Sequence, residues 1–194
     1  MILLWGVIFG VLAGVLRAWR NGCSFHPSYS VRGLAVLFIA FLPQLLAFYV
    51  PVTRTLTTLR SASVALIASQ VLLLIVVWLN RRFWAFWLMG AGLLLNLTVI
   101  LANGGMMPIS PATIVRLSPD FPPERLQTGT RLGYSKDVVL APESTRFPWL
   151  ADRFTVPDWY PQRVAFSLGD VLIALGAFGL FWSFGRCPQP VNDD

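Results

Sequence analysis

The sequence predicts an all-α integral membrane protein with about five transmembrane helices and one large polar segment between the fourth and the fifth. Of its 194 residues, 56% are hydrophobic and only 12% are charged, whereas a soluble domain carries about 25% charged residues. No Asp or Glu precedes Asp120. So small a polar fraction cannot cover a water-facing surface, and we expect residues 1–194 to form a single membrane domain surrounded largely by lipid.

Five apolar runs approach the length of about 20 residues that a helix needs to cross a bilayer. They are 2–19, 33–52, 63–79, 83–101 and 164–184. The first run has no charge before its apolar residues, so we expect an uncleaved helix and not a signal peptide. Only Asn80, Arg81 and Arg82 separate the third run from the fourth, which predicts a tight antiparallel hairpin.

The segment 102–163, between the fourth and fifth helices, is the predicted cap. It has 62 residues and holds nine of the fourteen prolines and six of the nine acidic residues. Trp149 and Trp159 make it too aromatic for a disordered tether, so we expect a folded, Pro-rich layer on the membrane surface. Ser110 followed by Pro111 predicts a helix N-terminus and a short helix over 111–117.

Arginine placement predicts the orientation. Suppose that the N-terminus is outside. The short inside segments then hold six arginines, which are Arg17, Arg20, Arg32, Arg81, Arg82 and Arg186. The short outside segment holds only two, Arg54 and Arg60. Positive residues favour the inner side. We therefore expect a multi-pass protein of the cytoplasmic (inner) membrane with its N-terminus outside, its C-terminus inside and an extracytoplasmic cap. Cys23 and Cys187 then face a reducing compartment, and no disulfide is expected.

Composition also bears on cofactors and partners. Two cysteines and the single His26 do not supply a usual four-ligand zinc site, so no metal and no cofactor is expected. The net charge of +6 comes mainly from arginines at the ends of apolar runs, where they meet lipid headgroups. Membrane lipid is the expected partner, with other membrane subunits as a second class and nucleic acid excluded.

Asp170 is the only acidic residue inside an apolar run. A carboxylate within the bilayer costs a few kcal/mol, so it normally meets a partner or a water-filled cavity. One interpretation is a structural pin, bonded to a helix end or paired with an arginine. The other is a group that binds a ligand or takes part in chemistry, within a pocket on the outer face.

Two further motifs are candidates for that pocket. In Asn103-Gly104-Gly105-Met106-Met107-Pro108, the glycines and Pro108 suit a helix C-cap, or Asn103 and the backbone amides face Asp170 across a pocket. In Gly133-Tyr134-Ser135-Lys136-Asp137, the residues form a solvated turn or supply a second carboxylate.

These motifs, with Phe166-Ser167-Leu168-Gly169-Asp170-Val171, resemble a family of bacterial multi-pass membrane proteins of unknown function. They also resemble lipoprotein signal peptidases, which are aspartyl proteases of the membrane with Gly-aromatic-Val-Val-Asp and Phe-Asn-x-Ala-Asp motifs. Gly133, Tyr134 and Asp137 match the first motif, and Phe166 and Asp170 match the second. This resemblance implies two carboxylates that share a proton and activate water.

The match to the peptidases has departures. Ser167 and Gly169 replace Asn and Ala, and Lys136 stands next to one of the two carboxylates, where it would depress a pKa that the mechanism needs raised. The leading hypothesis is therefore a non-catalytic binding or accessory protein with an outer-face pocket near Asp170. Its expected binding residues are Asn103, Gly104, Gly105, Met107, Pro108, Tyr134, Phe166 and Ser167. The alternative is an aspartyl membrane peptidase with Asp137 and Asp170 as catalytic residues.

Overall fold

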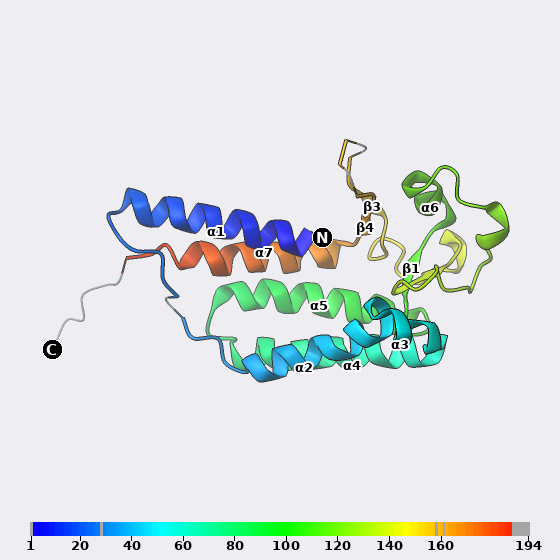
Figure 1. Ribbon diagram of the computed structural model, residues 1–194, viewed down its shortest axis with the longest axis horizontal. Coiled ribbons are helices and arrows are strands. Elements are labelled where there is room, and N and C mark those ends of the chain that lie inside the picture. The colour runs from blue at the N-terminus through cyan, green and yellow to red at the C-terminus, as the bar shows by residue number, and fades with distance from the viewer. Residues whose placement is uncertain (1, 28, 158, 161, 188–194) are drawn as a thin grey trace.

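The fold was obtained as a computed structural model that describes residues 2–27, 29–157, 159–160 and 162–187. Long helices form a bundle, and a smaller mixed cap covers one end of it (Figure 1). The bundle helices are α1 (Ile2–Arg20), α2 (Leu34–Gln44), α4 (Leu59–Leu79), α5 (Trp84–Ala102) and α7 (Leu168–Ser183). The chain is therefore mostly helical, as the sequence predicts.

The bundle helices pack as a row. α1 packs on α7, α7 on α5, α5 on α4, and α4 on α2. The first two long helices of the chain thus stand at opposite ends of the row, although only residues 21–33 join them (Figure 1).

Three helices of the described residues, α1, α4 and α5, are long and apolar enough to cross a membrane. Two shorter apolar helices, Leu34–Tyr49 and Leu168–Ser183, accompany them. Their outward side chains are large and apolar, with Phe38 74% exposed on α2 and Leu175 50% exposed on α7. Such surfaces suit lipid and not water, and the chain is a multi-pass membrane protein.

The run 33–52 was expected to form one helix, but the structure divides it. α2 ends at Gln44, a π-helical turn, η1 (Leu45–Tyr49), follows, and a short helix α3 (Pro51–Leu56) begins after Val50. Pro43 removes a backbone donor from the helix. Val50 is extended (ψ 120°) because it precedes Pro51.

Two other helices begin at residues that differ from the expected ones. α4 begins at Leu59, not at 63, because the hydroxyl of Thr58 caps the backbone N–H of Ser61. α7 begins at Leu168, not at 164, because Ala165–Phe166 form strand β4, which pairs antiparallel with β3 (Phe154–Thr155). The fifth helix therefore starts at the cap and has 16 residues.

The glycines of α1 explain how closely α1 and α7 pack. A Cβ added at Gly10 would lie 2.7 Å from the carbonyl oxygen of Phe178, and one added at Gly14 would lie 2.6 Å from that of Phe181. Both helices run from the cap end toward the opposite end, so they are parallel. This small-residue face is thus used inside the bundle.

The cap contains short strands and helical turns. β1 (Met107–Ile109) pairs in parallel with β2 (Asp137–Val139). Helix α6 (Pro111–Leu117) confirms the predicted 111–117 helix, with Ser110 capping Thr113. Two single 3₁₀ turns, η2 (Pro123–Arg125) and η3 (Pro142–Ser144), complete the cap.

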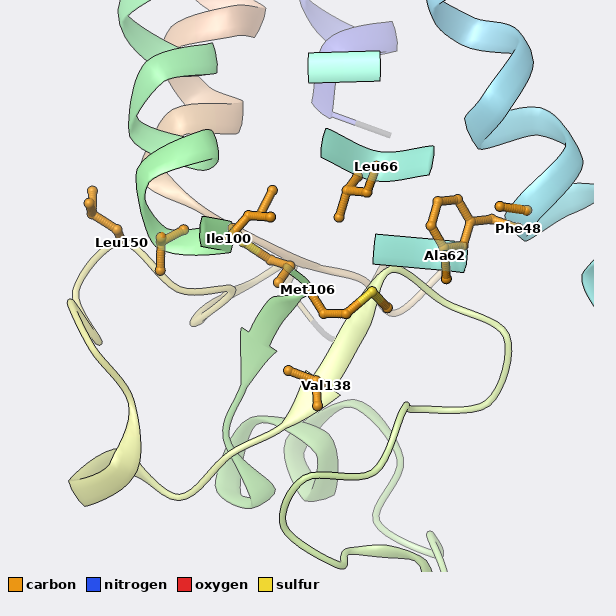
Figure 2. Close-up of a cluster of buried hydrophobic side chains, with 10 residues drawn as sticks. Phe48, Ala62, Leu66, Ile100, Met106, Val138 and Leu150 are labelled. Atoms are coloured by element: carbon orange, nitrogen blue, oxygen red, sulfur yellow. The ribbon is translucent and has the colours of Figure 1, made fainter. Parts of the chain in front are cut away.

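An apolar cluster joins the cap to the bundle (Figure 2). Met106 and Val138 of the cap pack with Leu66 of α4 and Ile100 of α5, and with Phe48 of η1. All five are at most 9% exposed. Because this cluster crosses the boundary, the cap is packed onto the helices and its position is fixed relative to them.

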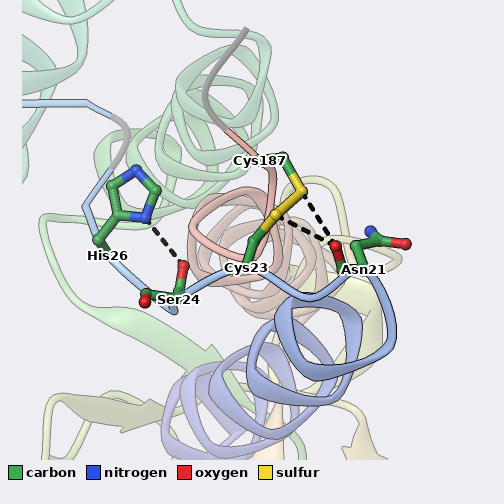
Figure 3. The surroundings of a disulfide bond; sticks show 5 residues. All are labelled: Asn21, Cys23, Ser24, His26 and Cys187. Atoms are coloured by element: carbon green, nitrogen blue, oxygen red, sulfur yellow. Dashed lines mark hydrogen bonds between the residues drawn. A yellow bond between two sulfur atoms is a disulfide. The ribbon is translucent and has the colours of Figure 1, made fainter.

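The opposite end holds a disulfide between Cys23 and Cys187, with their Cα atoms 5.6 Å apart (Figure 3). The prediction that these cysteines stay unpaired is wrong. It used only the expected compartment, whereas the parallel packing of α1 and α7 brings the residues just beyond both helices together. His26 lies nearby, with Nδ1 2.9 Å from the carbonyl oxygen of Ser24.

Candidate functional site

Strand β1 brings three charged residues of the cap together. On one side it pairs with β2, so that Met107 faces Asp137 and the Met107 N–H donates to the carbonyl of Lys136. On its other side, the N–H of Asp152 donates to the carbonyl of Pro108 at 3.2 Å. Lys136, Asp137 and Asp152 therefore converge around one short strand, although 16 residues separate the first from the last.

The ammonium group of Lys136 pairs with two carboxylates. It donates to Oδ2 of Asp152 and, at 3.3 Å, to Oδ1 of Asp137. The Asp152 side chain is 2% exposed, and its other oxygen, Oδ1, has no hydrogen-bond partner among the described residues. The Lys136 side chain is 38% exposed, so only the Asp152 side of the pair is buried. A half-satisfied ion pair of this kind contributes little to stability, so this arrangement points to a role beyond packing.

Burial and neighbouring charges shift the pKa of both partners. Burial chiefly raises the pKa of Asp152 to about 7, Asp137 and Asp170 act in the same direction, and Lys136 opposes them. Burial alone would lower the pKa of Lys136, but the three carboxylates outweigh it and raise that pKa. Lys136 is therefore charged near neutral pH, while Asp152 exchanges a proton there.

A cavity of about 740 Å³ adjoins this cluster, within the range of 300–1,000 Å³ usual for ligand pockets. Its walls come from both ends of the helix row and from the cap. Leu3 of α1, Phe48 of η1 and Ile173 of α7 supply apolar surface, and Lys136, Asp137 and Asp152 supply charge. The cavity thus has one apolar and one polar part at the boundary between bundle and cap.

Two arginines and a tyrosine complete the polar lining. The guanidinium of Arg54 stacks on the ring of Tyr134, 5.0 Å from its centroid, and its Nε is buried without a hydrogen-bond partner. Arg163 is exposed. Within the described residues, neither arginine forms an ion pair.

Asp170 lines the same cavity from the first turn of α7. Its Oδ2 accepts the backbone N–H of Ser167 at 3.1 Å, and Ser167 Oγ accepts the N–H of Asp170, which is a reciprocal capping box. Its Oδ1 accepts from Nδ2 of Asn96 at 2.9 Å. Asp170 thus starts α7 and ties it to α5, while part of its surface remains on the cavity.

The Asn103–Pro108 motif lies away from this cavity. Asn103 donates to the carbonyls of Val99 and Arg146 and accepts from the Arg146 N–H, so it ties α5 to the cap. Gly105 has φ +89°, and an added Cβ would collide with the side chain of Ser63. Gly104 has φ +80°, Met107 is buried at 1% exposure, and Pro108 lines a second, smaller cavity of about 350 Å³ within the cap.

The other expected residues lie at the large cavity or directly beside it. Tyr134, Asp137, Phe166 and Asp170 all line the large cavity, and Ser167 is buried beneath it, donating to Asn96 at 2.8 Å. Sequence reasoning missed Asp152, Arg54 and Arg163. The only signal for Asp152 was a carboxylate directly after the apolar Trp149-Leu150-Ala151, and nothing in the chain indicated that β1 would place it beside Lys136.

Among the described residues, no cluster of three or more His, Cys, Asp or Glu side chains is arranged to hold a metal ion. The three aspartates therefore surround an ammonium group and are not grouped as ligands.

Comparison with known proteins gives one match. No curated protein and no solved structure matches the chain significantly. Residues 28–182 match a protein family described as a family of unknown function (DUF5317). This segment includes the whole cavity lining except Ile2 and Leu3, and it leaves out both cysteines. Because the match covers well over half of the 194 residues, the chain belongs to the DUF5317 family.

Proposed function

We propose that this protein binds an amphiphilic membrane molecule in the 740 Å³ cavity and acts without catalysis, as a ligand-binding or accessory membrane component. The observation that carries the proposal is the half-satisfied Lys136–Asp152 pair at the wall of a cavity that has both polar and apolar walls. A buried pair without full hydrogen bonding is weak as a stabilising device. It is well suited to orient the polar end of a ligand.

The position of the cavity supports a ligand that comes from the bilayer. Its walls include Leu3 of α1 and Phe48 after α2, which belong to the two ends of the helix row. α7 has 16 residues, about 24 Å at 1.5 Å per residue, so it is shorter than the hydrocarbon core of about 30 Å. The cavity adjoins the first turn of α7, at the cap end of the bundle, which supports a position near the boundary between lipid tails and headgroups.

The proposal includes five membrane crossings, with α2 and η1 together forming the second and α7 the fifth. The chain direction supports this count. α1, α4 and α7 run away from the cap, whereas α2 and α5 run toward it (Figure 1). With the arginine distribution, this chain direction supports an orientation with the N-terminus and the cap outside the cytoplasm and the C-terminus inside. Other membrane subunits remain the second class of partner.

A cavity-filling variant tests ligand binding. Leu3 lines the cavity, whereas the neighbouring Leu4 does not, and both are exposed on α1 at 40% and 54%. Leu3→Trp is expected to reduce lipid retained by the detergent-purified protein at least severalfold, and Leu4→Trp is expected to leave it unchanged. Retained lipid is measured by native mass spectrometry after detergent washing. Equal retention in wild type and both variants would show that the bound lipid is not in this cavity.

An aspartyl peptidase is the second candidate, because Asp137 and Asp170 line the same cavity. Against it, Lys136 pairs with Asp137, and both oxygens of Asp170 accept hydrogen bonds from Asn96 and Ser167. These contacts occupy carboxylate oxygens that the mechanism needs for a shared proton and a water molecule. Cleavage of a membrane-anchored lipopeptide by the purified protein, abolished by Asp137→Asn, would establish the peptidase in place of the binding protein.

A further inference from the structure

The deep part of the cavity holds more negative than positive charge. Asp137, Asp152 and Asp170 line it together with a single ammonium group, that of Lys136. Oδ1 of the buried Asp152 has no partner. Arg131 is also close to Asp137, but its guanidinium lies behind the lining and donates to the carbonyls of Ala47, Tyr134 and Ser135. The excess of carboxylates on the cavity wall therefore favours a further cationic hydrogen-bond donor in the cavity.

The outer part of the cavity has the opposite charge. Arg163 is exposed and unpaired among the described residues. Arg54 is held in place by Tyr134 and keeps one unpartnered nitrogen. Guanidinium groups are suited to bind phosphate through paired hydrogen bonds. A ligand that satisfies both parts carries a cationic donor and a phosphate.

We infer that the cavity takes a membrane lipid whose headgroup carries both a phosphate and a primary ammonium group. The phosphate lies at Arg54 and Arg163, the ammonium group reaches toward Asp137 and Asp170, and an acyl chain follows the apolar surface of Leu3 and Ile173. This inference rests on the proposed function, since it names the class of amphiphile that the same cavity binds.

Other headgroups satisfy the cavity less well. A trimethylammonium group carries positive charge but has no N–H to donate to a carboxylate. A phosphoglycerol headgroup has no positive charge, so it adds no cation to the three carboxylates that line the cavity. A charge-assisted hydrogen bond contributes about 1.5–3 kcal/mol, which corresponds to roughly tenfold or more in affinity.

The test is a competition among three phospholipids with identical acyl chains and phosphoethanolamine, phosphocholine or phosphoglycerol headgroups. They are added in equal amounts to the full-length protein in detergent, and bound lipid is measured by native mass spectrometry. The phosphoethanolamine lipid is expected to be retained about tenfold over each of the others. Asp137→Asn is expected to remove most of this preference, and Arg163→Gln to weaken retention of all three lipids. Glu143→Gln and Arg146→Gln, in the cap but outside the cavity lining, are the matched controls.

The outcomes separate the inference from the proposed function. Equal retention of the three lipids, sensitive to Leu3→Trp, would overturn the headgroup inference and leave lipid binding in place. No retention of any lipid would overturn both. A further arm adds water-soluble glycerophosphoethanolamine as a competitor. If it displaces the lipid at equal concentration, the apolar surface contributes nothing, and the ligand is a soluble headgroup compound and not a lipid.

Discussion

The two ends of the bundle are held together in different ways. At the end away from the cap, Asn80 is fully buried and all its contacts are neutral. It accepts from the hydroxyl of Tyr29 and the N–H of Arg32, and donates to the carbonyls of Arg32 and Val76. The Cys23–Cys187 disulfide adds a covalent link there. At the cap end, a charged cluster borders a large cavity and leaves an oxygen of Asp152 unpartnered.

This difference indicates that the end away from the cap stabilises the fold, whereas the cap end is available to a ligand. Neutral, fully bonded groups such as Asn80 stabilise a fold with little penalty. Buried charges beside a cavity reduce the net stability of the region and persist where they serve another role.

The largest effect is expected from Lys136→Met. It leaves Asp152, which is 2% exposed, without its counter-charge, and is expected to lower the free energy of unfolding by about 3 kcal/mol. The double variant Lys136→Met/Asp152→Asn is expected to recover much of the loss, because no buried charge then remains unpaired. Thermal unfolding in detergent measures both. A single variant as stable as wild type would show that the pair is not buried as described.

A smaller effect is expected from pH. The pKa of Asp152 is about 7 in the folded protein, against about 4 for an unfolded aspartate. Between these values the folded state binds more protons than the unfolded state, so this group makes stability fall as pH rises from about 4 to about 7. Asp152→Asn is expected to remove that component of the slope. An identical pH profile in wild type and variant, measured by thermal unfolding, would assign the titration to other groups.

The smallest effect is expected at the disulfide end. In the proposed orientation Cys23 and Cys187 lie on the cytoplasmic side. Cys23→Ser removes a disulfide at the end of the bundle away from the cavity, so it is expected to leave lipid retention and cellular abundance unchanged. Because the two cysteines are paired, a membrane-impermeant maleimide is expected to label them only after reduction, and then only in permeabilised cells. Labelling of intact cells only after treatment with a reductant would place the disulfide outside and reverse the orientation.

The sequence predicts the helical bundle well, because long apolar runs and terminal arginines are local signals. It fails where the outcome depends on contacts between distant segments. The run 164–184 reads as one helix, but pairing with Phe154–Thr155 converts its first residues to a strand. Asp137 and Asp170 were found because each stands in a distinctive motif. Asp152 was missed because its partner, Lys136, is brought to it only through β1.

The place of α1 in the helix row has a consequence for how the protein is made. Its glycine face is covered by α7, the last long helix of the chain. At 5–20 residues per second, synthesis of the intervening chain takes on the order of 10 s, and during this time the first helix waits in the bilayer without its main partner. The large cavity, whose walls include both helices, is therefore completed only after α7 has been inserted.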